Sequence, residues 1–396
     1  QGASRKAGSM TANVTSIAKM RAAARDRAER IKVNNRTATT LLVLVVVLVV
    51  IGLGATQSAS SAVAIEEAQD RFYFFKRQLV GVGIGTAALL IASRVPYLFY
   101  RKIAIPFFLV TVALLGAVLV VGPVIGGAQR WLPVAGFSFQ PSELAKVAVV
   151  FSLAYLFEKK HKLLNRFGHF LVPVVFIVGT VGLLVMKQPD LGTVIVIGAA
   201  AMAVILASDA PLRFVALLAI SAILVVAVLA FSDDYRADRI VGFLDPWGNS
   251  SGEGYQLVQS YYALSNGGIF GVGLGASRAR WFYLPNAHTD FIFAIIGEET
   301  GLIGALTVIG LFVVLALSGW TVASRAPDKF GRMVAAGITV WLSFQALVNI
   351  GGVLGVLPIT GIALPFISFG STALIASMAA LGVLVNIAQA GVHRKA

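Results

Sequence analysis

The chain has 396 residues, of which 58% are hydrophobic and 13% are charged. A soluble domain carries about 25% charged residues, so this composition excludes a water-soluble globular protein. The sequence contains no cysteine, which excludes disulfides, thiol catalysis, iron–sulfur clusters and cysteine-based zinc sites. The formal net charge is +14, and its placement decides whether it indicates a nucleic-acid partner or a membrane topology.

Ten apolar segments approach the roughly 20 residues that a membrane-crossing helix needs. The fourth is the weakest because Glu143 and Lys146 interrupt it, and the eighth is long enough that it must tilt or bend at its glycines. We therefore predict an all-α integral membrane protein with ten transmembrane helices. The predicted segments are 37–56, 78–93, 103–122, 142–158, 169–186, 190–207, 211–231, 290–323, 331–355 and 371–391.

The basic residues follow the alternation of these segments. If both termini are cytoplasmic, the cytoplasmic segments are strongly basic and the outer segments are nearly neutral. This distribution is the positive-inside pattern of membrane proteins. The net charge therefore indicates orientation, and we expect no nucleic-acid partner.

The chain divides into a basic N-terminal region (1–36), a membrane domain (37–391) and a short cytoplasmic C-terminus (392–396). We expect residues 1–9 to be a leader added by cloning, since Gln1 cannot initiate translation and Met10 follows a Gly-Ser pair. Residues 10–33 carry a weak apolar stripe on a basic background. They are expected either to lie on anionic lipid as a helix or to form a disordered tail that sets topology.

The longest connection, residues 232–289, lies on the outer side, and a loop of that length is usually functional. Its aromatic residues suit a membrane interface and a lipid-linked polar substrate, although a structural hairpin is the alternative. The glycine-rich stretch 267–275 lacks the strand–turn–helix context of a phosphate-binding loop, so we interpret it as a flexible turn. The aromatic residues are Trp247, Tyr255, Tyr261, Tyr262, Phe270, Trp281, Phe282 and Tyr283.

Charged and polar residues inside apolar segments are costly and usually face a cavity or a partner. Glu143 and Lys146 are three residues apart and are expected to pair on one helix face. With the other polar groups near the outer halves of the helices, they predict a shared hydrophilic cavity, with pairing between helices as the alternative. The four histidines do not have metal-ligand spacing, which leaves open a carboxylate-held Mg²⁺ or Mn²⁺.

Six motifs then occur in one order, at 129–131, 140–146, 188–192, 256–259, 288–293 and 364–370. Together they resemble the SEDS family (shape, elongation, division and sporulation) of bacterial peptidoglycan polymerases over residues 37–391. Residues 295–299 and the long basic tail favour the division member of the family, with the elongation member as the near alternative. The resemblance implies a multi-pass protein of the bacterial cytoplasmic membrane, located at the division septum.

The resemblance also implies an activity and partners. The activity is that of a glycosyltransferase that polymerises lipid II into glycan strands at the outer face of the membrane. The implied partners are lipid II, the undecaprenyl-pyrophosphate-linked glycan, a class B penicillin-binding protein transpeptidase, other division proteins and membrane lipid.

The family's essential aspartate matches Asp290, its important tryptophan matches Trp131, and its Glu/Lys pair matches Glu143 and Lys146. We predict that Asp290 is the general base that deprotonates the attacking sugar hydroxyl. Arg130, Lys146 or a divalent ion would stabilise the pyrophosphate leaving group. The further candidates for substrate contact are Arg130, Trp131, Glu143, Lys146, Gln188, Asp190, Gln256, Gln259, His288, Glu298, Glu299 and Ser368.

Two alternative functions belong to other classes. A lipid II flippase would also use many helices and intramembrane charges, but its expected inverted repeats are not apparent and the motifs concentrate at the outer side. A membrane scaffold for division proteins would bind without either activity.

The sequence departs from the family at Asn286, where an acidic residue is frequent, and at 370–373, where Gly-Gly-Ser-Ser is frequent.

Overall fold

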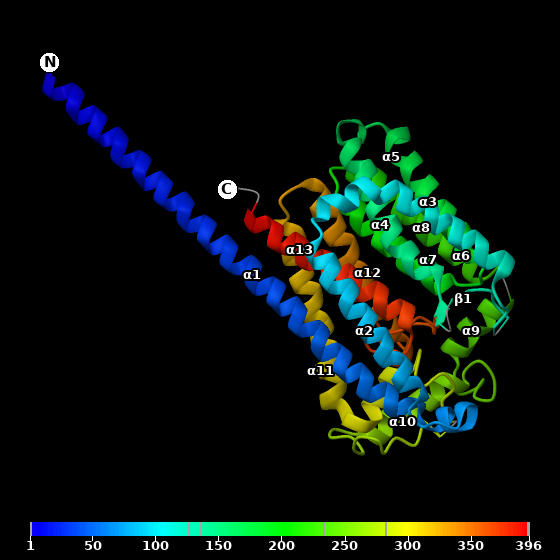
Figure 1. Cartoon of the computed structure of the whole chain (residues 1–396). Helices are drawn as coiled ribbons and strands as arrows, with labels where there is room; N and C mark the ends of the chain where they lie inside the picture. Colours follow the sequence, from blue (N-terminus) through cyan, green and yellow to red (C-terminus); the bar gives the residue numbers. More distant parts are fainter. Residues whose placement is uncertain (1, 126, 135–136, 233, 282, 394–396) are drawn as a thin grey trace.

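The computed structural model describes residues 2–125, 127–134, 137–232, 234–281 and 283–393, and it is mostly helical (Figure 1). Phe282, residue 1 and residues 394–396, which belong to the predicted interface aromatics, leader and C-terminal tail, lie outside the described residues. The helices are α1 (Gly2–Ala68), α2 (Tyr73–Arg94), α3 (Tyr97–Val121), α4 (Pro141–Lys159), α5 (Phe167–Val174), α6 (Thr180–Met186), α7 (Leu191–Leu206), α8 (Leu212–Ala230), α9 (Asp234–Leu244), α10 (Tyr255–Gly267), α11 (Ile292–Arg325), α12 (Lys329–Val353) and α13 (Ser371–His393). A 3₁₀ turn (His161–Leu163) follows α4, and a π turn (Val175–Gly179) joins α5 to α6.

Each of the ten predicted segments coincides with a helix or, for 169–186, with the continuous run from α5 to α6. Eight spans in the described residues are long and apolar enough to cross a membrane, and they lie in α1, α2, α3, α5–α6, α8, α11, α12 and α13. Of the other two segments, α7 is apolar but shorter, and α4 carries Glu143 and Lys146. The multi-pass architecture is thus confirmed, while the count of ten crossings stays a prediction.

The centre of the bundle is formed by α12. It packs against α11, α7, α4 and α13, and α13 in turn packs against α2 and α1 (Figure 1). The most apolar window of α12 is 78% buried, whereas that of α8 is only 6% buried. Because an apolar helix that is buried on few sides needs an apolar solvent, α8 is suited to face lipid. Polar side chains on α12 therefore lie deep inside the protein.

The all-α prediction misses one short β-hairpin on the way into α4. Strands β1 (Leu132–Val134) and β2 (Phe137–Phe139) pair antiparallel, with Leu132 opposite Phe139. A three-residue strand cannot display the alternation over four to eight residues by which a strand is recognised in sequence. The hairpin packs against α13 and leads directly into the 140–146 motif.

The expected bend in the eighth segment is confirmed at Gly301 of α11, which has φ +66° inside the helix. The glycine-rich stretch 267–275 packs at this bend. Its backbone N–H groups at Val272 and Gly273 donate to the carbonyl oxygens of Glu298 and Glu299, at 3.0 and 3.1 Å. The stretch is a turn, as predicted, but these hydrogen bonds fix it to α11.

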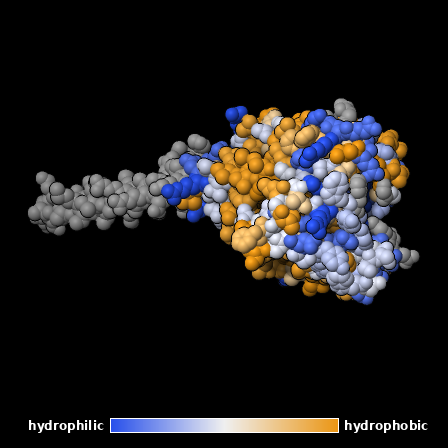
Figure 2. Space-filling view, turned by 90° about the horizontal axis from the view of Figure 1, so that it is seen from below, coloured by the Kyte–Doolittle hydropathy of each residue, from blue (hydrophilic) through white to orange (hydrophobic). Residues whose placement is uncertain are grey.

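The outer segment 232–289 contains two helices, α9 and α10, and α10 packs on α11. Figure 2 views the end of the bundle that carries this segment and shows hydrophobic side chains interspersed with hydrophilic ones. Exposed apolar and aromatic residues of the segment include Trp247, Tyr262, Phe270, Leu274, Trp281 and Tyr283. The placement of this surface at the membrane interface stays a prediction.

Residues 10–33 are part of the single helix α1, which extends beyond the bundle at its N-terminal end (Figure 1). The backbone here corresponds to the helical alternative for this region. Contact of this part of α1 with anionic lipid stays a prediction.

Candidate active site

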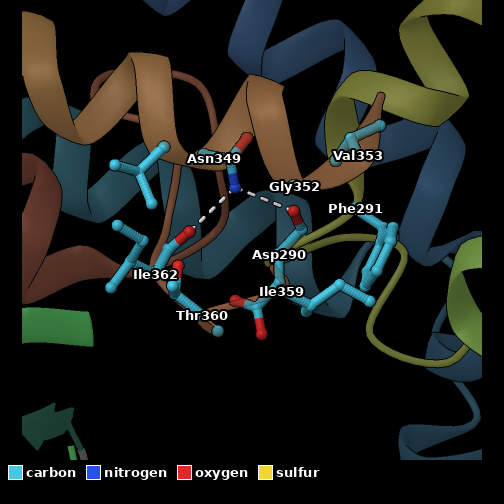
Figure 3. Close-up of a pocket in the computed structure, with 10 residues that line it drawn as sticks. Asp290, Phe291, Asn349, Gly352, Val353, Ile359, Thr360 and Ile362 are labelled. Carbon is cyan, nitrogen blue, oxygen red and sulfur yellow. Dashed lines mark hydrogen bonds between the residues drawn. The ribbon is translucent and has the colours of Figure 1, made fainter. Parts of the chain in front are cut away.

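Asp290 lies immediately before α11, at the end of the bundle that carries residues 232–289. Figure 3 shows its carboxylate on the side away from Asn349, beside Ile359 and Thr360. The residues around it come from the start of α11, the end of α12 and the segment that follows α12. Asp290 is half-buried, and none of the described residues donates a hydrogen bond to its carboxylate. Among the described residues, therefore, no donor competes for these oxygens.

The surroundings of Asp290 make it a better base than an ordinary aspartate. The pKa of Asp290 is raised to about 6, chiefly by burial; the charge of Arg239 lowers this pKa, that of Asp190 raises it and that of Arg130 lowers it. Burial dominates because a desolvated carboxylate is disfavoured relative to the neutral acid. A carboxyl group of this kind is ionised at neutral pH and still accepts a proton readily.

Three consecutive backbone carbonyls hold the segment that ends in Asp290. The carbonyl of His288 accepts a hydrogen bond from the Phe369 N–H at 3.0 Å, and that of Thr289 accepts one from Ser368 Oγ at 2.6 Å. The carbonyl of Asp290 accepts one from Asn349 Nδ2 at 2.8 Å (Figure 3). The position of the carboxylate is thus fixed through its backbone by α12 and the segment between α12 and α13.

His288 serves as a packing group rather than as a cation. Its ring lies 4.8 Å from the ring of Phe74 and 5.7 Å from that of Phe369, measured between centroids. Burial lowers the pKa of His288 to about 4, so the imidazole is neutral at physiological pH. Its predicted contact with substrate stays a prediction.

Ser368 is buried and already has partners. Its hydroxyl donates to the Thr289 carbonyl and accepts from the Leu364 N–H at 2.8 Å. Gln78 of α2 braces the same turn, because it donates to the Ser368 carbonyl and accepts from the Gly370 N–H. These contacts occupy the hydroxyl of Ser368, and through them Ser368 helps to position the segment that carries Asp290.

Arg130 secures the junction between α6 and α7. Its Nε donates to the Gln188 carbonyl at 2.8 Å and its Nη2 donates to the Pro189 carbonyl at 2.6 Å. Asp190 caps α7 by accepting from the N–H and the hydroxyl of Thr193. Since both Arg130 and Asp190 act on the pKa of Asp290, this junction lies within electrostatic reach of the carboxylate. The half-buried Trp131 follows Arg130 and leads into β1.

The pairing of Glu143 with Lys146 is confirmed. The two charged atoms are 2.7 Å apart, and the side chains are 7% and 1% exposed. Lys146 Nζ also donates to Gln345 Oε1 at 2.8 Å and lies 5.4 Å from the centre of the Trp341 ring. Lys146 thus has partners on both α4 and α12, which it needs because a buried charge without partners is strongly destabilising.

Glu298 and Glu299 form a second group on α11, separate from the contacts around Asp290. Glu298 accepts from the Ser277 hydroxyl and from the N–H groups of Arg278 and Ala279. Glu299 accepts from the Ser277 N–H and from the hydroxyl of Ser58 on α1. These contacts clamp the outer segment to α1 and α11. A contact of either carboxylate with substrate stays a prediction.

Gln256 and Gln259 lie on α10 and are half-buried. The neighbouring Ser260 ties α10 to α12 through a 2.7 Å hydrogen bond to the Val353 carbonyl. The structure thus places both glutamines on a helix next to α11 and α12. Their substrate contact stays a prediction.

Gln345 and Asn349 are the functional candidates that the sequence analysis missed. Both are buried on α12 and hold the segment that runs beside Asp290. A usable signal was present, since two amides one turn apart interrupt an apolar segment.

Among the described residues, no three His, Asp or Glu side chains are grouped so as to hold a metal ion. A divalent cation therefore stays a prediction.

Comparison with known proteins agrees with this geometry. A family profile described as "Cell cycle protein", which covers FtsW, RodA and SpoVE, matches residues 38–393. The chain is therefore a multi-pass membrane protein that belongs to the FtsW/RodA/SpoVE family. The predicted SEDS resemblance is thereby confirmed, and the curated FtsW relatives described next favour the division member.

Two curated relatives illustrate the match. The chain is 39% identical over 320 residues to the "Probable peptidoglycan glycosyltransferase FtsW" of Geobacter metallireducens, covering 80% of this chain and 85% of the relative. It is 40% identical over 325 residues to "Stage V sporulation protein E" of Bacillus subtilis, covering 81% and 88%. Both relatives are matched over most of their length.

Two solved structures share the fold. One, described as "Structural coordination of polymerization and crosslinking by a peptidoglycan synthase complex", superimposes with a TM-score of 0.72 at 28% identity, covering 89% of this chain and 97% of that one. The other is the rod shape determining protein RodA of Thermus thermophilus, with a TM-score of 0.66 at 26% identity and coverage of 88% and 95%. The helical arrangement is therefore that of this family.

Proposed function

We propose that the chain is a peptidoglycan glycosyltransferase that polymerises lipid II into glycan strands at the outer face of the cytoplasmic membrane, for cell division. Family membership and the curated name of the Geobacter relative support the reaction class. The observation that carries the proposal is the half-buried Asp290 carboxylate at the outer end of the bundle, which has a raised pKa and no hydrogen-bond donor among the described residues.

The topology fits this placement. We propose ten crossings, with α4 and α7 completing the eight long apolar spans. Both termini are cytoplasmic, so the segment 232–289 and Asp290 lie on the outer side. At the division septum, the protein would receive its lipid-linked substrate from the outer leaflet of the membrane.

The proposed reaction joins two lipid-linked sugars. Asp290 takes the proton of the 4-hydroxyl of one lipid-linked disaccharide, and the oxygen attacks C1 of the growing strand. A new glycosidic bond forms as the bond between C1 and the phosphate oxygen breaks. The undecaprenyl pyrophosphate leaves with the electron pair. A positioned base of this kind contributes about 10²–10⁴-fold to a rate.

The leaving group carries away negative charge, which cations stabilise without a proton donor. Arg130 is supported for this role because it lies within electrostatic reach of Asp290 while its guanidinium also orders the 188–190 turn. Lys146 is less suited, since Glu143 and Gln345 already bind its ammonium group. A divalent ion is the remaining source of positive charge, and removal of metal by EDTA tests it.

A cross-linking partner is part of the proposal. One structural neighbour is described as a complex that coordinates polymerization and crosslinking, which supports a class B penicillin-binding protein as the partner here. Other division proteins would bind the same assembly at the septum. An elongation role is the alternative, and complementation of a division-deficient strain against an elongation-deficient strain separates the two.

The test is the length of the product made by purified protein in detergent, where the two sides of a membrane do not exist. We expect lipid II to be converted into long glycan strands, and we expect Asp290→Ala to abolish them. The exposed outer-loop variant Asp245→Asn is the matched control and should retain activity. Translocation of lipid II in vesicles without any strands would indicate a flippase, and partner binding with neither activity would indicate a scaffold.

A further inference from the structure

We propose that Gln345 and Asn349 are positioning residues for the polymerisation reaction, because they hold the backbone that carries Asp290. The proposal rests on the role of Asp290 as the base. Gln345 and Asn349 are four residues apart on α12, so their side chains lie one above the other on the same helix face. Both are buried, with 2% and 5% exposure.

The contacts of the two amides converge on one stretch of backbone. Gln345 Nε2 donates to the Ala363 carbonyl at 2.8 Å, and Asn349 Nδ2 donates to the Ile362 carbonyl at 2.8 Å. The same Asn349 nitrogen also donates to the Asp290 carbonyl at 2.8 Å (Figure 3). One amide group thus joins the Asp290 segment to the segment that follows α12.

The orientation of both amides follows from the chemistry of their neighbours. Gln345 Oε1 receives hydrogen bonds from Lys146 Nζ at 2.8 Å and from Trp341 Nε1 at 2.9 Å. An ammonium and an indole N–H can only donate, so the oxygen of the amide must face them and the nitrogen must face Ala363. The two carbonyls next to Asn349 can only accept, which places its nitrogen between them.

This arrangement gives the buried Glu143–Lys146 pair a second task. Lys146 bridges Glu143 on α4 and Gln345 on α12, and Gln345 bridges to the Ala363 backbone. The charge of Lys146 therefore orients an amide that holds the segment beside the reactive carboxylate. This task does not require Lys146 to touch substrate.

The position of the Asp290 carboxylate depends on these backbone hydrogen bonds, because the carboxylate itself has no hydrogen-bond donor among the described residues. The neighbouring segment also comes close to it, since a Cβ atom at Gly361 would lie 3.5 Å from Asp290 Oδ2. Loss of the Asn349 donor would release both the Asp290 carbonyl and the Ile362 carbonyl. A displacement of about 1 Å in a catalytic group can cost about 10²-fold in rate.

The test compares kcat and KM for lipid II polymerisation by Asn349→Ala, Asn349→Asp and Gln345→Met proteins. We expect Asn349→Ala to lower kcat about 100-fold with little change in KM, since the base is misplaced while substrate contacts remain. Asn349→Asp keeps the volume but removes the donor, so it should lower kcat similarly. Gln345→Met should have a smaller effect of about 10-fold, because it acts on the neighbouring segment alone.

Asn386 of α13 provides the matched control. Its amide also joins two backbone groups, accepting from the Tyr97 N–H at 2.8 Å and donating to the Ser93 carbonyl at 2.7 Å, at the other end of the bundle. We expect Asn386→Ala to lower the melting temperature and to leave kcat within about 2-fold once the folded fraction is counted. An equal loss of kcat in Asn386→Ala and Asn349→Ala would contradict the proposal.

A double variant separates positioning from general stability. If Asn349 acts through Asp290, adding Asn349→Ala to Asp290→Asn should cause no further loss of kcat. An additional loss of about 100-fold in that background would overturn the inference. Normal activity of Asp290→Asn would instead refute the proposed base. Normal kcat in the Asn349 variants, with Asp290→Asn inactive, would refute the positioning role alone.

Discussion

Asp290 lies just before α11 and the Glu298/Glu299 pair lies in its first turns, yet their carboxylates have opposite surroundings. Glu298 accepts hydrogen bonds from three groups and Glu299 from two, and both are buried. Asp290 accepts none at its carboxylate from the described residues, although its backbone carbonyl is firmly held.

The difference indicates two uses of an acidic residue. A carboxylate whose oxygens are satisfied stabilises the contacts that satisfy it, and its removal leaves buried donors without partners. A carboxylate that is desolvated but has no donor is kept in a reactive state at a cost to stability. We therefore expect the first kind to affect folding and the second to affect rate.

The largest expected effect is on catalysis at Asp290. Asp290→Asn should lower kcat by about 10²–10⁴-fold, since the amide cannot take the proton. The pKa of the folded-state carboxyl lies at about 6, above the ordinary 3.8, so at neutral pH ionisation disfavours the folded state. The variant should thus melt at the same temperature or higher, which a thermal scan beside the activity assay can check. Loss of both activity and stability would contradict the account.

The next effect is on stability at Glu298. Glu298→Ala leaves the donors at Ser277, Arg278 and Ala279 without their acceptor, and those at Ser277 and Ala279 are buried, where an unsatisfied donor costs about 1–3 kcal/mol. We expect a lower melting temperature and a kcat within about 10-fold of wild type for the folded fraction, measured after size-exclusion chromatography. A fully stable protein that has lost polymerisation would make Glu298 part of the reactive site.

Two glycines of α11 allow a similar comparison, between Gly301 at the packed bend and Gly310 in a straight part of the helix. A Cβ atom at Gly301 would lie 2.4 Å from the Gly271 nitrogen, and its φ of +66° adds about 1–2 kcal/mol for any other residue. Gly301→Ala should therefore destabilise the protein. Gly310→Ala on the same helix meets no atom within 4 Å and should be neutral or stabilising by up to about 1 kcal/mol. Equal melting temperatures for the two variants would argue against the packed bend.

The smallest expected effect is on the pKa of Asp290. The charge of Asp190 raises this pKa and that of Arg130 lowers it. Asp190→Asn should therefore move the acidic limb of the rate profile to lower pH, and Arg130→Gln should move it to higher pH. We expect each shift to stay below about one unit, within the spread of carboxyl groups in folded proteins. Shifts in the same direction for both variants would contradict the electrostatic assignment.

Much of the framework was predictable because its signals are local in sequence. The apolar runs predict the helices, the three-residue spacing of Glu143 and Lys146 predicts their pair, and the glycines of the eighth segment predict the bend at Gly301. The candidate base followed from the resemblance of its motif to those of a known family.

The supports of the site were not predictable because they join distant parts of the chain. Asp290 is held from α12 and Glu299 is bound by Ser58 of α1, and no local pattern encodes either contact. The sequence shows that the apolar segments contain polar residues, but it does not show which of these residues meet, because that depends on how the helices pack. The short β-hairpin escaped for the different reason that its strands are too brief to show a period.

The claim that Asp290 is the general base is tested most directly by the pH dependence of kcat/KM for the wild-type protein. Because the base must be ionised to accept a proton, the rate should be constant at neutral pH and fall tenfold per unit below a midpoint near the pKa of about 6. A rate that stays level through that region, down to the ordinary carboxyl value of 3.8, would contradict the account.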